Sequence, residues 1–133
     1  MKKVLAFVCL VALVIGAIAE AESEGEIVMR YQYINKLTAA ISISDNVATC
    51  TGSVTPNNGE RTSIVVRLQK SVGGVWITQK TWTASNPGGR SEAGGSTSVV
   101  SGYQYRTYVT AKVYDGSGNV VESVDKYSST VNN

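Results

Sequence analysis

Apolar and polar residues alternate at every second position along most of this chain, and that alternation restricts the fold more than any other feature. Clusters of Gly, Asn, Asp and Pro separate the alternating runs. In an extended strand successive side chains point to opposite faces, so this period predicts strands with one buried and one solvated face. From residue 27 onward no window shows apolar residues at helical spacing. The sequence therefore predicts an all-β protein.

Seven strands are predicted from residue 37 onward. They fall in the alternating runs 37–44, 47–54, 64–69, 75–83, 96–101, 103–114 and 120–128. Tight turns are predicted at 45–46, 73–74 and 115–119, and residues 84–95 are predicted to form a long loop. Strands of this number and spacing are typical of an immunoglobulin-like or fibronectin-III-like antiparallel sandwich, with a small barrel as the alternative. Residues 26–34 are a possible eighth strand along one edge.

The alternation assigns Val54, Ile64 and Val66 to the predicted core, and two further core residues carry specific expectations. Tyr105 opens an alternating run and is the candidate for a tyrosine corner, in which the hydroxyl bonds to upstream main chain. Cys50 lies on the second predicted strand, among small residues that share its face. The position where an immunoglobulin domain would carry the partner cysteine is Thr107, so Cys50 is predicted to be buried and reduced.

The first residues have the pattern of a secretory signal peptide. Lys2 and Lys3 precede an apolar run from residue 4 to 19, and small residues follow at the spacing of a cleavage site. Cleavage is predicted after Ala19 or Ala21, which makes 1–21 a signal peptide, 22–35 an acidic leader and 36–133 the sandwich domain. The protein is therefore expected to be secreted, into the medium or the cell-wall space, without a stable membrane anchor.

Charge and composition argue against several functions. Without residues 1–19, ten basic residues balance ten acidic ones, which argues against nucleic acid as a partner. The chain has no His, which excludes Ser-His-Asp and Cys-His mechanisms and His-containing zinc sites. Asp115 begins a turn that resembles half a calcium loop, but Asp-Gly and Gly-Asn are ordinary hairpin residues. We therefore expect no metal, no cofactor and no enzymatic activity.

Two surfaces of the predicted sheet are candidate ligand-binding sites. Trp76 and Trp82 have an even spacing on one strand, so in a regular strand they would share a face and could stack on sugar rings. Tyr108 and Tyr114 lie with Arg106 and Lys112 on the outer face of the last hairpin. If Tyr114 pairs with Val120 there, Lys112 falls opposite Glu122 and Tyr108 opposite Lys126.

The loops at one end of the predicted sandwich are the third candidate. The ranges 56–61, 84–95 and 115–119 are expected to gather there, bringing Arg90, Glu92 and Asp115 near one another. Loops on a rigid scaffold are where such folds commonly place binding residues.

The chain also resembles a family of small exported proteins of Gram-positive bacteria whose function is unknown. The resemblance covers nearly the whole chain after the signal peptide and implies a single sandwich with a leader, but no catalytic or binding residue. It is carried by the segments 30–34, 48–54, 68–70, 102–106 and 126–130, and by Trp76 and Trp82.

Three functions remain open from the sequence. The first is a secreted, monomeric binding module for an unknown protein or cell-surface polymer. The second is a carbohydrate-binding module that uses exposed aromatic residues. The third is a structural or assembly protein of the cell surface, because exposed sheet edges are templates for pairing.

Overall fold

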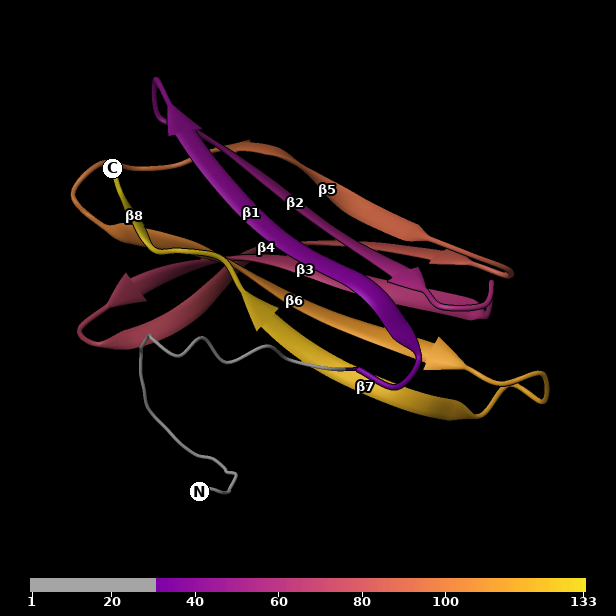
Figure 1. Ribbon diagram of the computed structural model, residues 1–133. Coiled ribbons are helices and arrows are strands. Elements are labelled where there is room, and N and C mark those ends of the chain that lie inside the picture. Colours follow the sequence, from indigo (N-terminus) through magenta and orange to yellow (C-terminus); the bar gives the residue numbers. More distant parts are fainter. Residues whose placement is uncertain (1–30) are drawn as a thin grey trace, which may run out of the picture. The chain divides into compact units, whose positions relative to one another are not determined.

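A computed structural model describes residues 31–133, and this part of the chain is all β (Figure 1). The predicted signal peptide and most of the acidic leader lie outside the described residues. The strands are β1 (Ile34–Ser44), β2 (Val47–Pro56), β3 (Arg61–Val72), β4 (Val75–Asn86), β5 (Ser91–Ser98), β6 (Gln104–Tyr114), β7 (Val120–Tyr127) and β8 (Val131–Asn132).

The strands form two antiparallel sheets that pack as a sandwich, which confirms the predicted fold class. The first sheet has the order β1-β2-β5 and the second has the order β4-β3-β6-β7, with β8 pairing with β6. Figure 1 shows the first sheet lying across the second. In the constant-type immunoglobulin arrangement the fourth strand joins the first two, whereas here β4 pairs with β3 and widens the second sheet.

The core lies between the sheets and is built from the predicted alternating positions. Cys50 and Val54 of β2 face Ile64 and Val66 of β3, and all four side chains are buried. Gly52 lies at the closest approach, because a Cβ there would come within 2.7 Å of a methyl carbon of Val109. The two sheets therefore leave no room for a side chain at Gly52.

The tyrosine corner is present. The Tyr105 hydroxyl donates a hydrogen bond of 2.7 Å to the Val100 carbonyl oxygen, and the side chain is only 1% exposed. Burial raises the pKa of the Tyr105 phenol, although the bond to Val100 opposes that shift. Tyr103, which has the same strand parity but lies before β6, is 38% exposed.

The predicted loop over 84–95 is wrong. β4 continues to Asn86 and β5 begins at Ser91, so only four residues connect them. Glycines led to the error, because Gly94 and Gly95 form ladder pairs with Thr51 and Cys50 of β2. A Cβ on Gly94 would collide with the Cys50 carbonyl oxygen, so this glycine permits a close backbone approach rather than a flexible loop.

Two further strand predictions are also corrected. The predicted strand 96–101 is displaced, since β5 ends at Ser98 and residues 99–103 are not strand. The eighth strand is β8 near the C-terminus, while residues 31–33 of the proposed edge strand are not strand; residues 26–30 lie outside the described residues. Asn133 extends the β8 connection by bonding through its main chain to Gly102 and Tyr103.

Three single-residue bulges interrupt otherwise regular strand pairs. Asn35 in β1, Gln79 in β4 and Val121 in β7 each have no direct partner in the register, because the pairing skips one residue there. A bulge moves every later side chain on its strand to the opposite face. The bulges at Gln79 and Val121 decide which side chains meet on the outside of the second sheet.

Candidate functional site

The two tryptophans lie on opposite faces of β4, so the prediction of a shared face is wrong. Trp82 pairs with buried Val66 and points between the sheets, where a Cβ on Gly95 would be 2.6 Å from its Nε1. Trp76 pairs with Ser71 beyond the Gln79 bulge and lies on the outer face, under Arg106. The extra residue between them cancels the even spacing.

The second bulge changes the predicted pairs on the last hairpin. Tyr114 pairs with Val120 as expected, but the bulge at Val121 shifts the rest of β7 by one residue. Tyr108 is consequently opposite Tyr127 rather than Lys126. The two tyrosine rings stack with centroids 4.7 Å apart and planes inclined by 14°.

Lys112 and Glu122 are also separated by this shift. Lys112 lies opposite Ser123, whereas the Glu122 carboxylate accepts hydrogen bonds from the main-chain nitrogens of Gln32 (3.1 Å) and Tyr33 (2.8 Å). Glu122 therefore fixes the segment before β1 and does not neutralise Lys112.

Five side chains on the outer face of the second sheet form a continuous stack, called here the aromatic–arginine stack. Its members, in order, are Trp76, Arg106, Tyr127, Tyr108 and Arg67. The guanidinium carbon of Arg106 lies 4.2 Å from the Trp76 ring centroid and 4.1 Å from that of Tyr127. The guanidinium carbon of Arg67 lies 4.6 Å from the Tyr108 centroid. Such cation–π contacts favour one fixed arrangement of long side chains.

Hydrogen bonds underneath the stack hold Arg106 in place. The Arg106 Nε donates to Gln69 Oε1 at 2.9 Å, and Gln69 Nε2 in turn donates to Thr78 Oγ1 at 3.4 Å. Gln69 is only 8% exposed although it lies on an outer face. The stack is therefore supported by a buried polar side chain, which makes Arg106 rigid.

Arg67 is positioned through a hydroxyl rather than through a carboxylate. Its Nη1 donates to Thr110 Oγ1 at 3.1 Å, and Thr110 donates to Asp125 at 2.8 Å. Within residues 31–133 the only ion pair joins Arg90 and Glu92, elsewhere on the molecule. Neither arginine of the stack is thus paired with a carboxylate in the described part of the chain.

The outer face of the second sheet has an unequal charge. Four basic side chains lie there, namely Arg61, Arg67, Arg106 and Lys112, and Asp125 is the acidic one, as the strand registers show. Over residues 31–133 the chain has nine basic and six acidic residues. The near balance of the whole sequence therefore conceals a face that is strongly basic.

The loops at one end gather as predicted, with 87–90 in place of 84–95, but the expectation that Arg90 and Glu92 join Asp115 there is wrong, because neither lines the cavity that Asp115 lines. The loops surround a cavity of about 280 Å³ whose lining includes Glu60, Arg61, Tyr114 and Asp115. Both carboxylates of this lining, those of Glu60 and Asp115, accept hydrogen bonds from nearby main chain. Glu60 accepts from the main-chain nitrogen of Asn58, and Asp115 accepts from two nitrogens of its own turn.

Those turn bonds, chiefly the one from the Asn119 main chain, lower the pKa of Asp115. Asp115 is therefore a turn residue, as its Gly-rich context predicted. Arg61 remains available at the cavity, with its guanidinium carbon 4.6 Å from the Tyr114 centroid. Tyr114 is fixed by a 2.9 Å hydrogen bond to Ser63.

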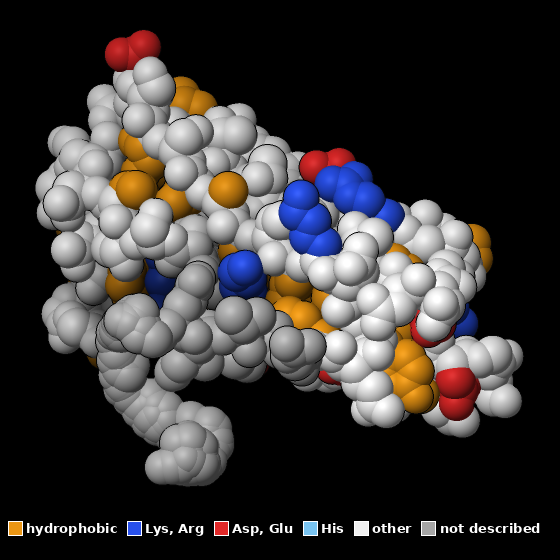
Figure 2. All heavy atoms as spheres, in the orientation of Figure 1, with side chains coloured by type: hydrophobic (Ala, Val, Ile, Leu, Met, Phe, Trp, Pro, Cys, Tyr) orange, Lys and Arg blue, Asp and Glu red, His pale blue; other side chains and the backbone are white. Residues whose placement is uncertain are grey.

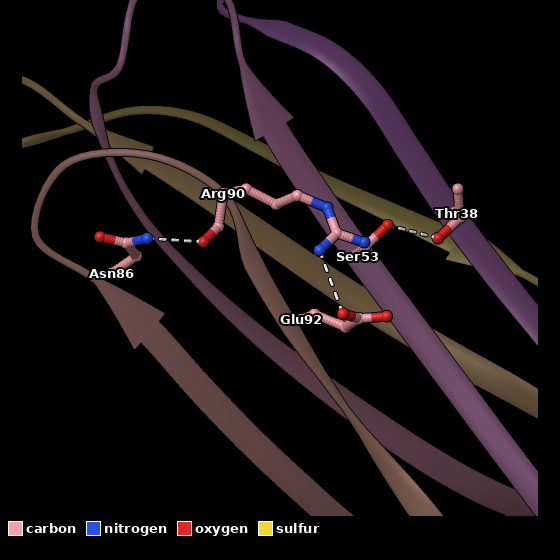
Figure 3. Close-up of polar contacts among 5 residues, drawn as sticks. All are labelled: Thr38, Ser53, Asn86, Arg90 and Glu92. Carbon is pink, nitrogen blue, oxygen red and sulfur yellow. Dashed lines mark hydrogen bonds and ion pairs between the residues drawn. The ribbon is translucent and has the colours of Figure 1, made fainter.

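Arg90 and Glu92 form a separate group next to the first sheet. Figure 3 shows the Arg90 side chain reaching toward Glu92, and the ion pair measures 3.0 Å. Asn86 closes the intervening turn through a 2.7 Å bond to the Arg90 carbonyl oxygen. Both charged side chains are half exposed and neutralise each other, so this pair holds the β4–β5 turn and adds little net charge.

The outside of the first sheet has a different character, since it is lined with small hydroxyl side chains. Thr38 pairs with Ser53 at 2.6 Å and Thr49 with Ser96 at 2.8 Å. In Figure 2 the side where β1 crosses is mostly white, the colour of uncharged polar side chains and backbone. These hydroxyls bond to one another in pairs across neighbouring strands, and Figure 3 shows the Arg90 side chain lying beside one of them, Ser53.

The tip of the β3–β4 hairpin exposes apolar side chains. Val75 is 61% exposed, Ile77 44% and Val72 39%. Val72 and Val75 form a ladder pair next to the Gly73-Gly74 turn. The hairpin therefore presents a small apolar patch away from the aromatic–arginine stack.

Comparison with known proteins yields no assignment: no protein-family model matches the chain, and no curated protein matches it. In residues 31–133 no helix has the length and apolar character needed to span a membrane. The described residues also contain no group of three or more Cys, Asp or Glu side chains placed to hold a metal ion.

Sequence reasoning found part of the stack and missed its organisation. Trp76 and Tyr108 were candidate residues, and Arg106 was placed on the correct face. Tyr127 was not recognised, because the predicted register put Lys126 in its place. A Tyr one residue before the end of the last alternating run is the signal that was present, but the bulge that turns it outward has no sequence signature.

Proposed function

We propose that this protein is a secreted, non-enzymatic binding module that contacts its partner through the aromatic–arginine stack. The observation that supports this proposal most directly is the stack itself. Trp, Tyr and Arg are the residues most enriched at energetically dominant positions of interfaces, and here five of them are pre-ordered on one face. The export signal predicted from the sequence supports a partner outside the cell.

Rigidity supports binding as the role of this face. Arg106 is held between two rings and by Gln69, and Tyr108 is held between Tyr127 and Arg67. Long side chains normally lose rotamer freedom when they bind a partner, at a cost of about 0.5–1.5 kcal/mol each. Side chains that are already ordered avoid much of this cost.

The same geometry disfavours a sugar platform. Stacking on a sugar ring requires an open aromatic face, but Arg106 covers one face each of Trp76 and Tyr127, and Tyr108 covers another face of Tyr127. Tyr127 and Tyr108, in the middle of the stack, therefore have both ring faces covered, and Trp76 at its end has one face covered. The loss of the shared tryptophan face removes the other support for carbohydrate stacking.

A binding screen with matched variants tests this proposal. The purified protein is applied to immobilised cell-wall polymers, neutral and acidic polysaccharides and extracellular proteins. We expect at least one partner whose binding falls tenfold or more in Tyr127→Ala and is unchanged in Tyr103→Ala, since both tyrosines are exposed but only Tyr127 belongs to the stack. Equal binding by the two variants for every partner found would place the site elsewhere.

The β3–β4 hairpin favours a second candidate, assembly with a second copy of this chain. Exposed apolar side chains at Val75 and Ile77 are the kind of surface that association covers. Sedimentation of the protein against the variant Val75→Ser/Ile77→Ser tests it. A concentration-dependent dimer that the double variant abolishes would favour assembly, and a monomer at all concentrations would reject it.

A further inference from the structure

We infer that the ligand of this face is an extended acidic polymer, bound through its phosphate, sulfate or carboxylate groups. This inference rests on the proposed function and names the class of its partner. The N–H donors of the stack, the charge of the face and the spacing of its basic residues all favour such a ligand.

Toward the residues that the structure describes, the two arginines of the stack use only part of their hydrogen-bond donors. A guanidinium carries five N–H groups. Arg106 uses its Nε on Gln69, and Arg67 uses its Nη1 on Thr110; among residues 31–133 neither has a carboxylate partner. Because the rings cover guanidinium faces, the remaining N–H groups lie at the guanidinium edges. That geometry suits planar, two-point recognition of an oxyanion.

The charge of the face selects the sign of the partner. Along the strands of this face Arg61, Arg67, Arg106 and Lys112 outnumber one acid, Asp125, which is already bonded to Thr110. Glu60 and Asp115 lie beside Arg61 at the loop end, so the excess of positive charge is greatest around Arg67, Arg106 and Lys112. Basic groups gathered on one face raise the local concentration of anions and steer them during association. A neutral polymer would leave the two ordered guanidinium groups without acceptors.

The basic residues are distributed along β6 rather than gathered at a point. Arg106 and Lys112 lie on β6, while Arg67 pairs with Tyr108 and Arg61 with Tyr114. Measured along β6, the four basic residues therefore extend from position 106 to position 114, a distance of roughly 27 Å at about 3.4 Å per residue. A single small anion would contact one row, whereas an extended polymer with repeated charges would contact all of them.

A binding series with the purified protein tests the inference. The probes are inorganic polyphosphate, dextran sulfate, polygalacturonate, unmodified dextran and a single-stranded oligonucleotide. We expect affinity for at least one of the first three, which separate phosphate, sulfate and carboxylate sources, and none for dextran. Affinity should fall with rising salt, because counterions are released on binding.

Two double variants with equal loss of charge provide the control. Arg67→Gln/Arg106→Gln removes the stack's charges, and Lys36→Gln/Lys80→Gln removes two from elsewhere on the domain. We expect the first to weaken binding of the acidic polymer at least tenfold and the second less than twofold. Equal weakening would overturn the inference, since it would show binding by net charge alone.

A second measurement uses the unmodified sequence, so it does not depend on whether a variant folds. A dicarbonyl reagent modifies accessible arginines, and mass spectrometry locates the modified residues. A saturating acidic polymer should protect Arg67 and Arg106 but not Arg90, whose partner is Glu92. Protection of none of the three, or of all three equally, would contradict the assigned site.

The outcomes separate this inference from the proposed function. If a neutral polymer or a protein binds and Tyr127→Ala abolishes that binding, the face is a binding site but its ligand is not an acidic polymer. Tighter binding to the oligonucleotide than to any of the three acidic polymers would also overturn the inference. If the acidic polymers bind and Tyr127→Ala has no effect, both proposals fail.

Discussion

Replacing Gly94 by Ala should be among the most damaging single changes in this domain. Gly94 lies inside β5 with φ of +146°, a conformation that side-chain-bearing residues rarely adopt. A Cβ there would collide with the Cys50 carbonyl oxygen and come within 2.9 Å of the Thr51 Cα. Both obstacles are backbone atoms of the central strand of the first sheet, so neither can turn away as a flexible side chain could.

The magnitude follows from two terms. Holding a residue with a Cβ in a sparsely populated backbone region costs of order 1–3 kcal/mol, and overpacking a close contact costs typically about 1–3 kcal/mol. We therefore expect Gly94→Ala to lower the free energy of unfolding by about 2–6 kcal/mol. That is a large part of the roughly 5–15 kcal/mol that stabilises an ordinary domain, and it corresponds to a drop in Tm of more than about 8 °C.

Urea denaturation followed by tryptophan fluorescence measures this loss, with Gly116→Ala as the matched control. Gly116 lies in the β6–β7 turn without a positive φ, and a Cβ there meets nothing within 4 Å. We expect the control to stay within about 0.5 kcal/mol of the parent. A loss below about 1 kcal/mol in Gly94→Ala would refute the close backbone approach and restore a flexible loop at this position.

The remaining predictions concern the core. A thiol reagent should label buried Cys50 slowly in the native protein and fast in the unfolded protein, and rapid labelling of the native protein would contradict burial. Cys50→Ser should lower the free energy of unfolding by roughly 1–3 kcal/mol. In parallel urea titrations, Tyr105→Phe should lower the free energy of unfolding by about 0.5–1.5 kcal/mol, because its hydrogen bond is lost, and Tyr103→Phe should lower it less. Equal urea midpoints for the two variants would count against the tyrosine corner. Burial raises the pKa of both the Cys50 thiol and the Tyr105 phenol, so the unfolded chain ionises first, from about pH 8.5 and pH 10 respectively. Stability should accordingly fall as pH rises above about 8.5, and Cys50→Ala should remove the earlier part of that fall; a Tm that is constant from pH 7 to 11 would refute it.

The sequence alone determined the class of fold and most of the core. Period-two alternation assigned Cys50, Val54, Ile64 and Val66 to the inside, because burial of one face demands that every second residue be apolar. Turns at 45–46 and 73–74 were equally predictable. Asp45, Asn46, Gly73 and Gly74 all have positive φ, a conformation that Asn, Asp and Gly adopt most readily.

The tyrosine corner was predictable for a related reason. Tyr105 begins an alternating run at the place where a sandwich needs its hydroxyl to bond with upstream main chain, and local order along the chain is enough to find that place. Features that depend on one strand or one turn were therefore available from the sequence.

Tertiary structure decided the rest, and the reason is the parity of strands. The bulges at Gln79 and Val121 each insert one residue whose presence depends on pairing with a distant strand, so no local pattern marks them. Each exchanges the faces of the residues beyond it, separating Trp76 from Trp82 and bringing Tyr127 against Tyr108. The glycines of β5 were misread for a similar reason, because a residue without a side chain looks like a loop until the strand beside it is known.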